Sequence, residues 1–497
     1  MNLMYRSTRD SNNRVTASQA VLQGLSSDGG LFVPEEMPVL SKTFEELSKM
    51  DYREVAYEVM KLFLTDYTEV ELKDCINKAY DQKFDTPEIA PLKKVGQAYY
   101  LELFHGATIA FKDMALSILP HLLTKAAKKN EVKDDIVILT ATSGDTGKAA
   151  LAGFADVEGT KIIVFYPKDG VSSVQEKQMV TQKGDNTYVI GIQGNFDDAQ
   201  TGVKMMFNNS DLAKRLKDSG YLFSSANSIN IGRLVPQIVY YVYSYVSLYR
   251  ENQIVAGEKI NFVVPTGNFG NILAAYYAKS IGVPINKLIC ASNDNKVLYD
   301  FFETGRYDRN REFILTESPS MDILVSSNLE RLIYHIADND SEKTAQFMKA
   351  LNNQGVYEIT DSMKEKLHGF VGGWASETET RAAIHKEYQD NNYVIDTHTA
   401  VAASVFGSYV NNTKDATKSV IVSTASPYKF ANSVLSALNV DEVPSDDYDQ
   451  ALVLKKVSGT EIPNAVEEIR TAPVLHNTVC ETAKMQEAVE GILKIGN

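Results

Sequence analysis

The chain has 497 residues, too many for one small hydrophobic core, and its apolar and charged fractions are those of a soluble globular protein with two or three domains. The formal net charge of −14 is spread along the sequence without a basic tract, which argues against nucleic-acid binding. Only three cysteines occur, Cys75, Cys290 and Cys480, and their spacing argues against a disulfide framework and a thiolate zinc site. No apolar run approaches the roughly 20 residues of a membrane span, and the start lacks a signal-peptide core, so we expect a cytoplasmic protein.

Residues 1–98 predict an N-terminal cap domain. Helical patterns cover 44–63 and 69–83, and Asp28, Gly29 and Gly30 predict a tight turn, because glycine tolerates positive φ.

Residues 99–225 predict a small α/β domain. A helical pattern over 114–129 is interrupted by Pro120. Strand patterns then alternate with helical ones, the strands at 135–142, 160–167 and 187–194 and the helices at 148–157, 172–184 and 197–207. This alternation is typical of a parallel sheet covered by helices.

Residues 226–497 predict a second, large α/β domain. A long helix at 229–252 is followed by a strand (260–267), a helix (272–282) and a strand (287–293). The region 300–390 is predicted to be mainly helical, with a break at Gly372 and Gly373, before a helix at 394–410 and a strand that ends in the polar residues of STASPYKF. Two βα series indicate two α/β domains with a cleft between them.

Lys112 is the candidate catalytic residue. It lies in LELFHGATIAFKD, next to small and apolar residues rather than solvating ones. Desolvation lowers the pKa of a lysine and frees its lone pair for Schiff-base chemistry with a carbonyl. Most lysines are solvated, so this window alone leaves a surface role open.

Two turns follow predicted strands and are rich in small residues. PTGNFGN, residues 265–271, precedes a helix whose amides and dipole favour a phosphate, although it lacks the third glycine of a dinucleotide fingerprint. TATSGDTGK, residues 140–148, can wrap a carboxylate, but Thr142 and Ala149 do not match a nucleotide P-loop.

Hydroxyl groups also gather in STASPYKF, residues 423–430, where a strand ends and Lys429 follows. The seven histidines, among them His105, His121 and His398, show no metal-ligand spacing, so no metal site is expected.

With these motifs in this order, the chain resembles the threonine synthase family, pyridoxal-phosphate (PLP) lyases of the tryptophan-synthase-β fold type (fold type II). HGATIAFKD matches the family's lysine motif, SGDTG its substrate-side loop, GNFGN its phosphate loop, and STRD with QGLSSDGGLFVPEE its N-terminal signature. SANSINIGRL and STASPYKF also fit, so the resemblance runs from the first ten residues to beyond Phe430. Ala107 departs from the frequent proline, and Ser426 from the histidine of some members.

The resemblance implies a role for each motif. Lys112 would hold PLP through a Schiff base, with Asp145 near the phenolic oxygen and Thr424 facing the ring nitrogen. The cofactor's phosphate would lie on the loop formed by Gly267, Asn268, Phe269, Gly270 and Asn271. Substrate contacts would come from Ser143, Gly144, Thr146, Asn227, Arg233 and Lys429. Arg233 and Lys429, and less strongly Lys148, are the candidates for a second phosphate.

The implied reaction converts O-phospho-L-homoserine and water to L-threonine and phosphate by γ-elimination and β-addition, the last step of threonine biosynthesis, in a monomer or homodimer. Two alternatives stay open. One is another PLP lyase of the same fold, such as a threonine or serine dehydratase, which needs no cations for a second phosphate. The other is a non-catalytic ligand-binding protein that would carry no bound chromophore.

Overall fold

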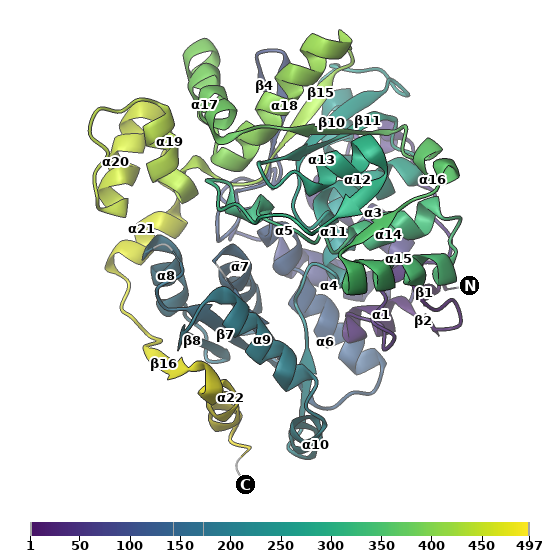
Figure 1. Ribbon diagram of the computed structural model, residues 1–497, viewed down its shortest axis with the longest axis vertical. Helices are drawn as coiled ribbons and strands as arrows, with labels where there is room; N and C mark the ends of the chain where they lie inside the picture. The colour runs from purple at the N-terminus through teal and green to yellow at the C-terminus, as the bar shows by residue number, and fades with distance from the viewer. Residues whose placement is uncertain (1, 143, 172, 496–497) are drawn as a thin grey trace.

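The structure is a computed structural model that describes residues 2–142, 144–171 and 173–495 (Figure 1). It contains two mainly parallel sheets, a small N-terminal sheet and many covering helices. Within the described ranges, no helix is both long and apolar enough to cross a membrane.

The N-terminal region combines a three-stranded antiparallel sheet with four helices. The sheet has the order β2-β1-β3, formed by Tyr5–Ser7 (β1), Arg14–Val15 (β2) and Phe32–Pro34 (β3). The helices are α1 (Ala17–Gln23), α2 (Phe44–Leu47), α3 (Tyr52–Phe63) and α4 (Glu69–Ala79). Each begins at a capping box, in which Thr16, Thr43, Asp51 or Thr68 exchanges hydrogen bonds with the residue three positions later. The chain therefore encodes these helix starts locally.

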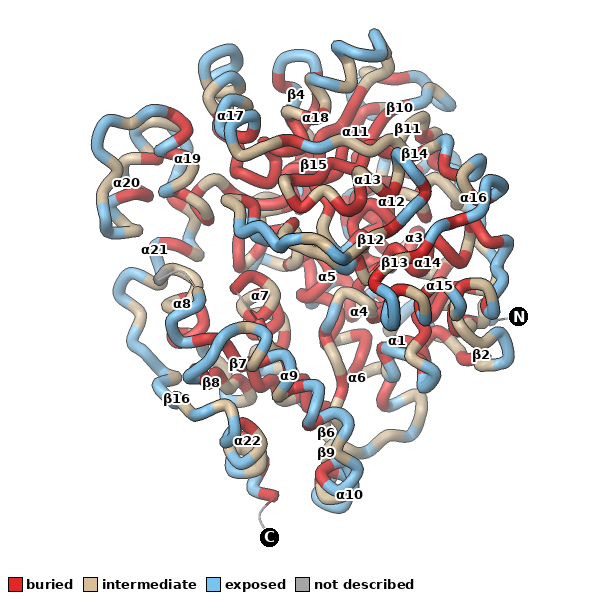
Figure 2. Tube along the Cα trace, in the orientation of Figure 1, coloured by how far each residue is buried: buried red, intermediate tan, exposed pale blue. Residues whose placement is uncertain are grey.

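The large sheet has the order β14-β11-β10-β15-β5-β4 and is parallel except for the edge pair β4 and β5. Its strands are Leu92–Val95 (β4), Ala98–Glu102 (β5), Ile260–Pro265 (β10), Ile285–Ser292 (β11), Phe370–Trp374 (β14) and Ser419–Ser423 (β15). Every residue of β5, β10 and β15 is buried, and neighbouring residues such as Phe262 and Val263 enter different hydrophobic cores. The sheet is thus covered on both faces. In Figure 2 the trace around the labels β10 and β15 is red, the colour of buried residues.

The structure corrects the prediction for Gly372 and Gly373. They do not break a helical region but lie inside β14, paired with β11. A Cβ atom at Gly373 would collide with Val405, and one at Gly372 would press on Phe302. The two glycines therefore let helices pack closely on an edge strand.

The helices around this sheet are α11 (Ile231–Arg250), α12 (Gly270–Ser280), α13 (Val297–Thr304) and α18 (Thr397–Thr413). A short sheet pairs Arg306–Asp308 (β12) with Val356–Glu358 (β13). The other elements here are the turn η1 (Pro319–Met321) and helices α14 (Leu329–Ile336), α15 (Ser341–Gln354), α16 (Asp361–Glu365) and α17 (Glu377–Asn391). After β15 follow η2 (Pro427–Phe430), α19 (Ala431–Ala437), α20 (Asp447–Ser458) and α21 (Asn464–Thr471).

The small sheet is fully parallel and has the order β16-β8-β7-β6-β9. Its strands are Asp135–Ala141 (β6), Thr160–Pro167 (β7), Thr187–Gln193 (β8), Tyr221–Ser224 (β9) and Thr478–Glu481 (β16). Its helices are α7 (Asp145–Phe154), α8 (Ser173–Val180), α9 (Phe196–Phe207), α10 (Ser210–Asp218) and α22 (Met485–Leu493), the last preceded by η3 (Thr482–Lys484). Helices α5 (Asp113–Leu116) and α6 (Leu119–Lys129) lead into it, and Pro120 lies in the first turn of α6.

Two strands bear on the predicted domain boundaries. Most of β5 falls after residue 98, yet it pairs with β15 of the large sheet. Strand β16, within the predicted domain 226–497, pairs with β8, so the yellow end of the chain returns to the small sheet in Figure 1. The boundaries at 98/99 and 225/226 stay predictions; the sheets themselves are built from separated segments.

Candidate active site

Lys112 immediately precedes α5 and is held at the end of β15. The Phe111 amide donates to the carbonyl of Thr424 at 2.8 Å, and Ala110 forms an isolated bridge with Ala425. The Lys112 Nζ donates to Ser320 Oγ at 3.2 Å and lies 3.6 Å from Asp145 Oδ2. Burial lowers the pKa of this amine, Asp145 opposes the shift, and the nearby Lys429 adds to it. The amine is therefore desolvated, as its neighbours in the sequence predict.

Asp145, the first residue of α7, is the counter-ion of two lysines. Its Oδ1 lies 3.2 Å from Lys429 Nζ, and its Oδ2 accepts a hydrogen bond from Ser320 Oγ at 3.3 Å. Burial alone would raise the pKa of Asp145, but Lys429 and Lys112 outweigh it and hold the pKa well below its usual range. Lys429 is fully enclosed and also donates to the Thr108 carbonyl at 2.8 Å. Asp145 is therefore ionised, and it fixes both ammonium groups.

The turn before α7 is built around Thr142. Its hydroxyl accepts the amides of Gly144 and Gly147 at 2.9 and 3.0 Å. Gly144 has φ 145°, in the region that glycine tolerates best. Thr146 follows in the first turn of α7 and is half-buried, while Ser143 lies outside the described residues. The turn therefore connects the end of β6 to Asp145, the first residue of α7.

The loop 267–271 joins β10 to α12 and approaches the same region. The carbonyls of Gly267 and Asn268 accept hydrogen bonds from Ser326 and Asn328. Phe269 has left-handed backbone geometry, with φ 65°, which lets α12 begin at Gly270. A Cβ atom at Gly267 would collide with the Ser320 carbonyl, so glycine permits the close approach of the two segments. This loop thus lies against the residue that binds the Lys112 amine.

Two buried donors near this loop have no partner in the described part of the chain. Asn271 uses its Oδ1 to accept from Tyr240 and Tyr241, which leaves its Nδ2 unpaired. Arg233, in the first turn of α11, donates Nη1 to the Ala226 carbonyl at 2.9 Å, but its Nε is unpaired. Burial lowers the pKa of Arg233 to about 10. Unsatisfied buried donors are costly, so both indicate an anionic guest.

The remaining predicted residues lie at different depths. Thr424 is buried just after β15. Asn227 is exposed on the loop before α11, where its amide donates to Ser225 Oγ, so the structure does not bring its side chain into the buried cluster. Lys148 is not a solvated surface charge: its Nζ donates to Gln182 at 2.6 Å, and burial together with Lys429 lowers its pKa to about 8.

Three residues that the sequence analysis did not assign to the site complete it. Ser320 bonds both Lys112 and Asp145, and its own amide donates to His398 Nε2 at 3.1 Å. Asp396 accepts from His398 Nδ1 at 2.8 Å, which makes Nε2 the acceptor nitrogen. Asp396 also caps the N-terminus of α18. Lys112 and Ser320 are 208 residues apart, so no local pattern could have linked them.

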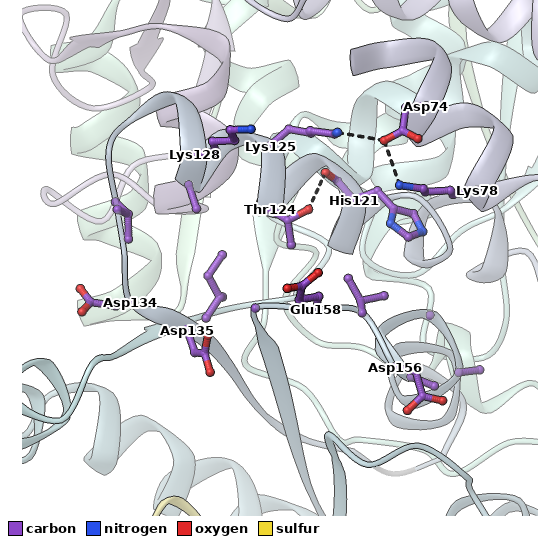
Figure 3. A pocket seen from close by; sticks show the side chains of 18 of the residues that line it. Asp74, Lys78, His121, Thr124, Lys125, Lys128, Asp134, Asp135, Asp156 and Glu158 are labelled. Carbon is purple, nitrogen blue, oxygen red and sulfur yellow. Dashed lines mark hydrogen bonds and ion pairs between the residues drawn. The ribbon is translucent and has the colours of Figure 1, made fainter. Parts of the chain in front are cut away.

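A cavity of about 850 Å³ lies elsewhere, between α4, α6 and the residues flanking β6 and β7 (Figure 3). None of the predicted site residues lines it. Its lysines and carboxylates are mixed, and Asp74 pairs with Lys78 and Lys125 at 3.0 and 2.9 Å. This cavity is separate from the Lys112 cluster.

The cluster fits PLP on three observations. A desolvated lysine amine stands at its centre. The N-terminus of α12 and the unpaired Asn271 Nδ2 offer donors for a phosphate. The collision expected of a Cβ atom at Gly267 shows that the backbone of the loop comes close to the site.

Family models match most of the chain. "Threonine synthase N terminus" covers residues 4–80, "Pyridoxal-phosphate dependent enzyme" 85–425 and "Threonine synthase, C-terminal" 399–472. Threonine synthase-like 1 of Macaca fascicularis is 40% identical over 97% of this chain, which spans only 65% of that relative's length. Threonine synthase of Schizosaccharomyces pombe is 37% identical over 88% of this chain and 89% of its own.

A solved structure agrees over nearly the whole length. PLP-bound threonine synthase from Brucella melitensis superposes with a TM-score of 0.85 and 32% identity, covering 99% of each chain. The expected fold, two α/β domains of PLP fold type II with an N-terminal domain, is thereby confirmed. The chain belongs to the threonine synthase family of PLP-dependent enzymes.

Proposed function

We propose that this protein is a threonine synthase, which converts O-phospho-L-homoserine and water to L-threonine and phosphate. The observation that carries the proposal is the charge balance around Lys112. Lys429 and Arg233 are buried, the Lys112 side chain beside them is only 14% exposed, and Asp145 is the one carboxylate within ion-pair distance of any of the three in the described structure. Such an excess of cations suits a substrate that brings a second phosphate besides the cofactor's own.

Bound PLP supplies an electron sink for negative charge at the substrate's Cα. The protein provides the proton transfers. The Lys112 amine is the proposed base, and burial favours its unprotonated form by lowering its pKa. Ser320, bonded to both Lys112 and Asp145, holds this amine in place, and His398 fixes the Ser320 backbone.

We assign the two phosphates to different groups. The amides of 267–271 and the Asn271 side chain hold that of the cofactor, since they lie at the start of α12. Arg233, with its unpaired Nε, is the first candidate for the substrate phosphate. Lys429 is the second, although it already has Asp145 as its counter-ion.

Thr424 would face the ring nitrogen of the cofactor, and Gly144 and Thr146 would surround the substrate carboxylate. A hydroxyl at position 424 would leave the ring nitrogen unprotonated, which would limit the electron sink and suppress transamination. Asn227 is proposed as a substrate contact only if its exposed loop closes over the bound substrate.

The test is turnover of O-phospho-L-homoserine by purified, PLP-loaded protein, with phosphate and threonine measured separately. Equal amounts of both products support the proposal. Absence of turnover, together with release of a 2-oxo acid and ammonia from threonine or serine, would identify a dehydratase of the same fold instead.

A further inference from the structure

A second cavity, of about 460 Å³, lies at the opposite edge of the large sheet from Lys112. Its walls come from the residues that precede β10, β11 and β14, from the first residues of β11 and from the last turn of α12. The candidate active site lies where β10 and β15 end, at the carboxyl edge. The two sites therefore share α12 but occupy its opposite ends, with the loop 267–271 at its start and Lys279 near its end.

The lining of this cavity is cationic. Lys259, Lys279 and Lys287 contribute ammonium groups, and none of the described residues that line the cavity is an aspartate or a glutamate. None of the three lysines forms an ion pair within the described structure. This contrasts with the larger cavity of Figure 3, which is lined by both lysines and carboxylates and where Asp74 pairs with Lys78 and Lys125. Three lysines without a carboxylate in one cavity are unusual in a chain with a net charge of −14.

The side chains of Lys279 and Lys287 are held against the wall of the cavity, whereas Lys259 is exposed to solvent at its rim. Lys279 Nζ donates to the Asn286 carbonyl at 3.2 Å, and Lys287 Nζ donates to the His368 carbonyl at 2.6 Å. Both side chains are half-buried. Burial lowers the pKa of Lys279, and Lys259 and Lys287 lower it further by repulsion.

A structural role explains only part of this arrangement. Lys279 lies in the last turn of α12, where a cation is favoured by the helix dipole. That effect does not account for Lys259 and Lys287, which come from other segments and increase the repulsion. Each ammonium has three donors, and the backbone carbonyls named above accept from only two of the three lysines. Donors therefore remain for a guest that would also relieve the repulsion.

We propose that this cavity binds a compact oxyanion with at least two negative charges, a phosphoryl compound or a polycarboxylate, held by Lys259, Lys279 and Lys287. A volume of about 460 Å³ accommodates an anion the size of pyrophosphate or citrate. The site lies outside the reaction proposed above and does not depend on it.

The test is calorimetric titration of the PLP-loaded protein with inorganic pyrophosphate and, separately, with citrate at constant ionic strength. The variants are Lys279→Gln and the double variant Lys279→Gln/Lys287→Gln. Lys128→Gln is the matched control, because Lys128 also lies in the last turn of a helix and lines the other cavity. We expect saturable binding in the wild type, about tenfold weaker binding in Lys279→Gln, no detectable binding in the double variant and no change in the control.

Binding of pyrophosphate alone, of citrate alone or of both supports the site and identifies its chemical class. No saturable binding of either anion by the wild type would overturn the proposal. So would unchanged affinity in the double variant, because the anion would then occupy another site such as the Lys112 cluster. Thermal unfolding gives a second measurement: the anion should raise the Tm of the wild type but not of the double variant, which without anion should be at least as stable as the wild type.

Discussion

Asp145→Asn removes one charge from the centre of the active site and preserves the shape of the side chain. In the variant, Lys429 and Lys112 lose their counter-ion, although their side chains are only 1% and 14% exposed. Breaking a buried ion pair by removing one partner costs about 3 to 5 kcal/mol. We expect the free energy of unfolding of the cofactor-free protein to fall by about 4 kcal/mol at pH 7.

The pH dependence of this loss identifies its cause. A buried lysine without a counter-ion can release its proton, at a cost of about 1.4 kcal/mol for each pH unit below its ordinary pKa of 10.5. That cost is about 5 kcal/mol at pH 7 and about 2 kcal/mol at pH 9, so the loss should shrink as pH rises. In the wild type, the lowered pKa of Asp145 stabilises the fold fully above the ordinary value of 3.8, and this contribution is lost progressively as pH falls from 3.8 towards the lower pKa of the folded state. The difference between variant and wild type should therefore also narrow below pH 4.

Urea unfolding of both cofactor-free proteins, followed by far-ultraviolet circular dichroism at pH 3.5, 7 and 9, measures the loss. Glu358→Gln, which removes the solvent-exposed partner of Lys364, is the control and should leave the midpoint unchanged. Equal midpoints for Asp145→Asn and the wild type at pH 7 would refute the buried ion-pair interpretation. A loss of the same size at pH 7 and 9 would refute the deprotonation argument.

Three further predictions concern the active-site side chains. Lys112→Ala should abolish turnover with the circular dichroism spectrum retained, and borohydride reduction of the wild type should label Lys112; a label on another lysine would contradict the assignment. Thr424→Asp should protonate the cofactor's ring nitrogen and favour transamination, which is checked by the absorbance spectrum with substrate and by amino-group transfer; normal turnover with an unchanged spectrum would move the ring-nitrogen partner elsewhere. Arg233→Ala should reduce kcat/KM for phosphohomoserine by about tenfold to a hundredfold, and Arg233→Lys nearly as much, because lysine cannot bind a phosphate bidentately; an unchanged kcat/KM at full PLP occupancy would remove Arg233 from the phosphate site.

Continuous apolar runs and the alternation of strand and helix patterns make most of the fold predictable. The strand predicted at 160–167 has the same bounds as β7, because its branched and aromatic residues are buried on both faces. The helical pattern around Pro120 was also informative, since a proline in the first turn separates α5 from α6. Strand β14 is not predicted, because its two glycines have no side chains to show a strand pattern. Glycine is needed there because Val405 and Phe302, from other elements, pack against the strand.

Part of the site is also predictable from the sequence and part is not. Motifs predict Lys112, Asp145 and the loop 267–271, because each lies in a short segment with characteristic residue types. Ser320 and the pair Asp396 and His398 have no such segment, and their role arises only where distant parts of the chain meet. Whether a lysine is solvated is likewise a tertiary property. Lys148 is therefore the weakest candidate in the sequence, although it is half-buried in the fold and donates to Gln182.

The return of β16 to the small sheet affects how the protein is made. Gln193, at the end of β8, and Thr482, just after β16, are in contact across 289 residues. A ribosome that adds 5 to 20 residues per second needs about 15 to 60 s to synthesise that stretch. Throughout this interval, the nascent small sheet exposes β8 as an open edge, which can pair with strands of other chains. A chaperone would therefore protect the growing chain most between the synthesis of β8 and that of β16. The exposure of the β8 edge ends when β16 pairs with it.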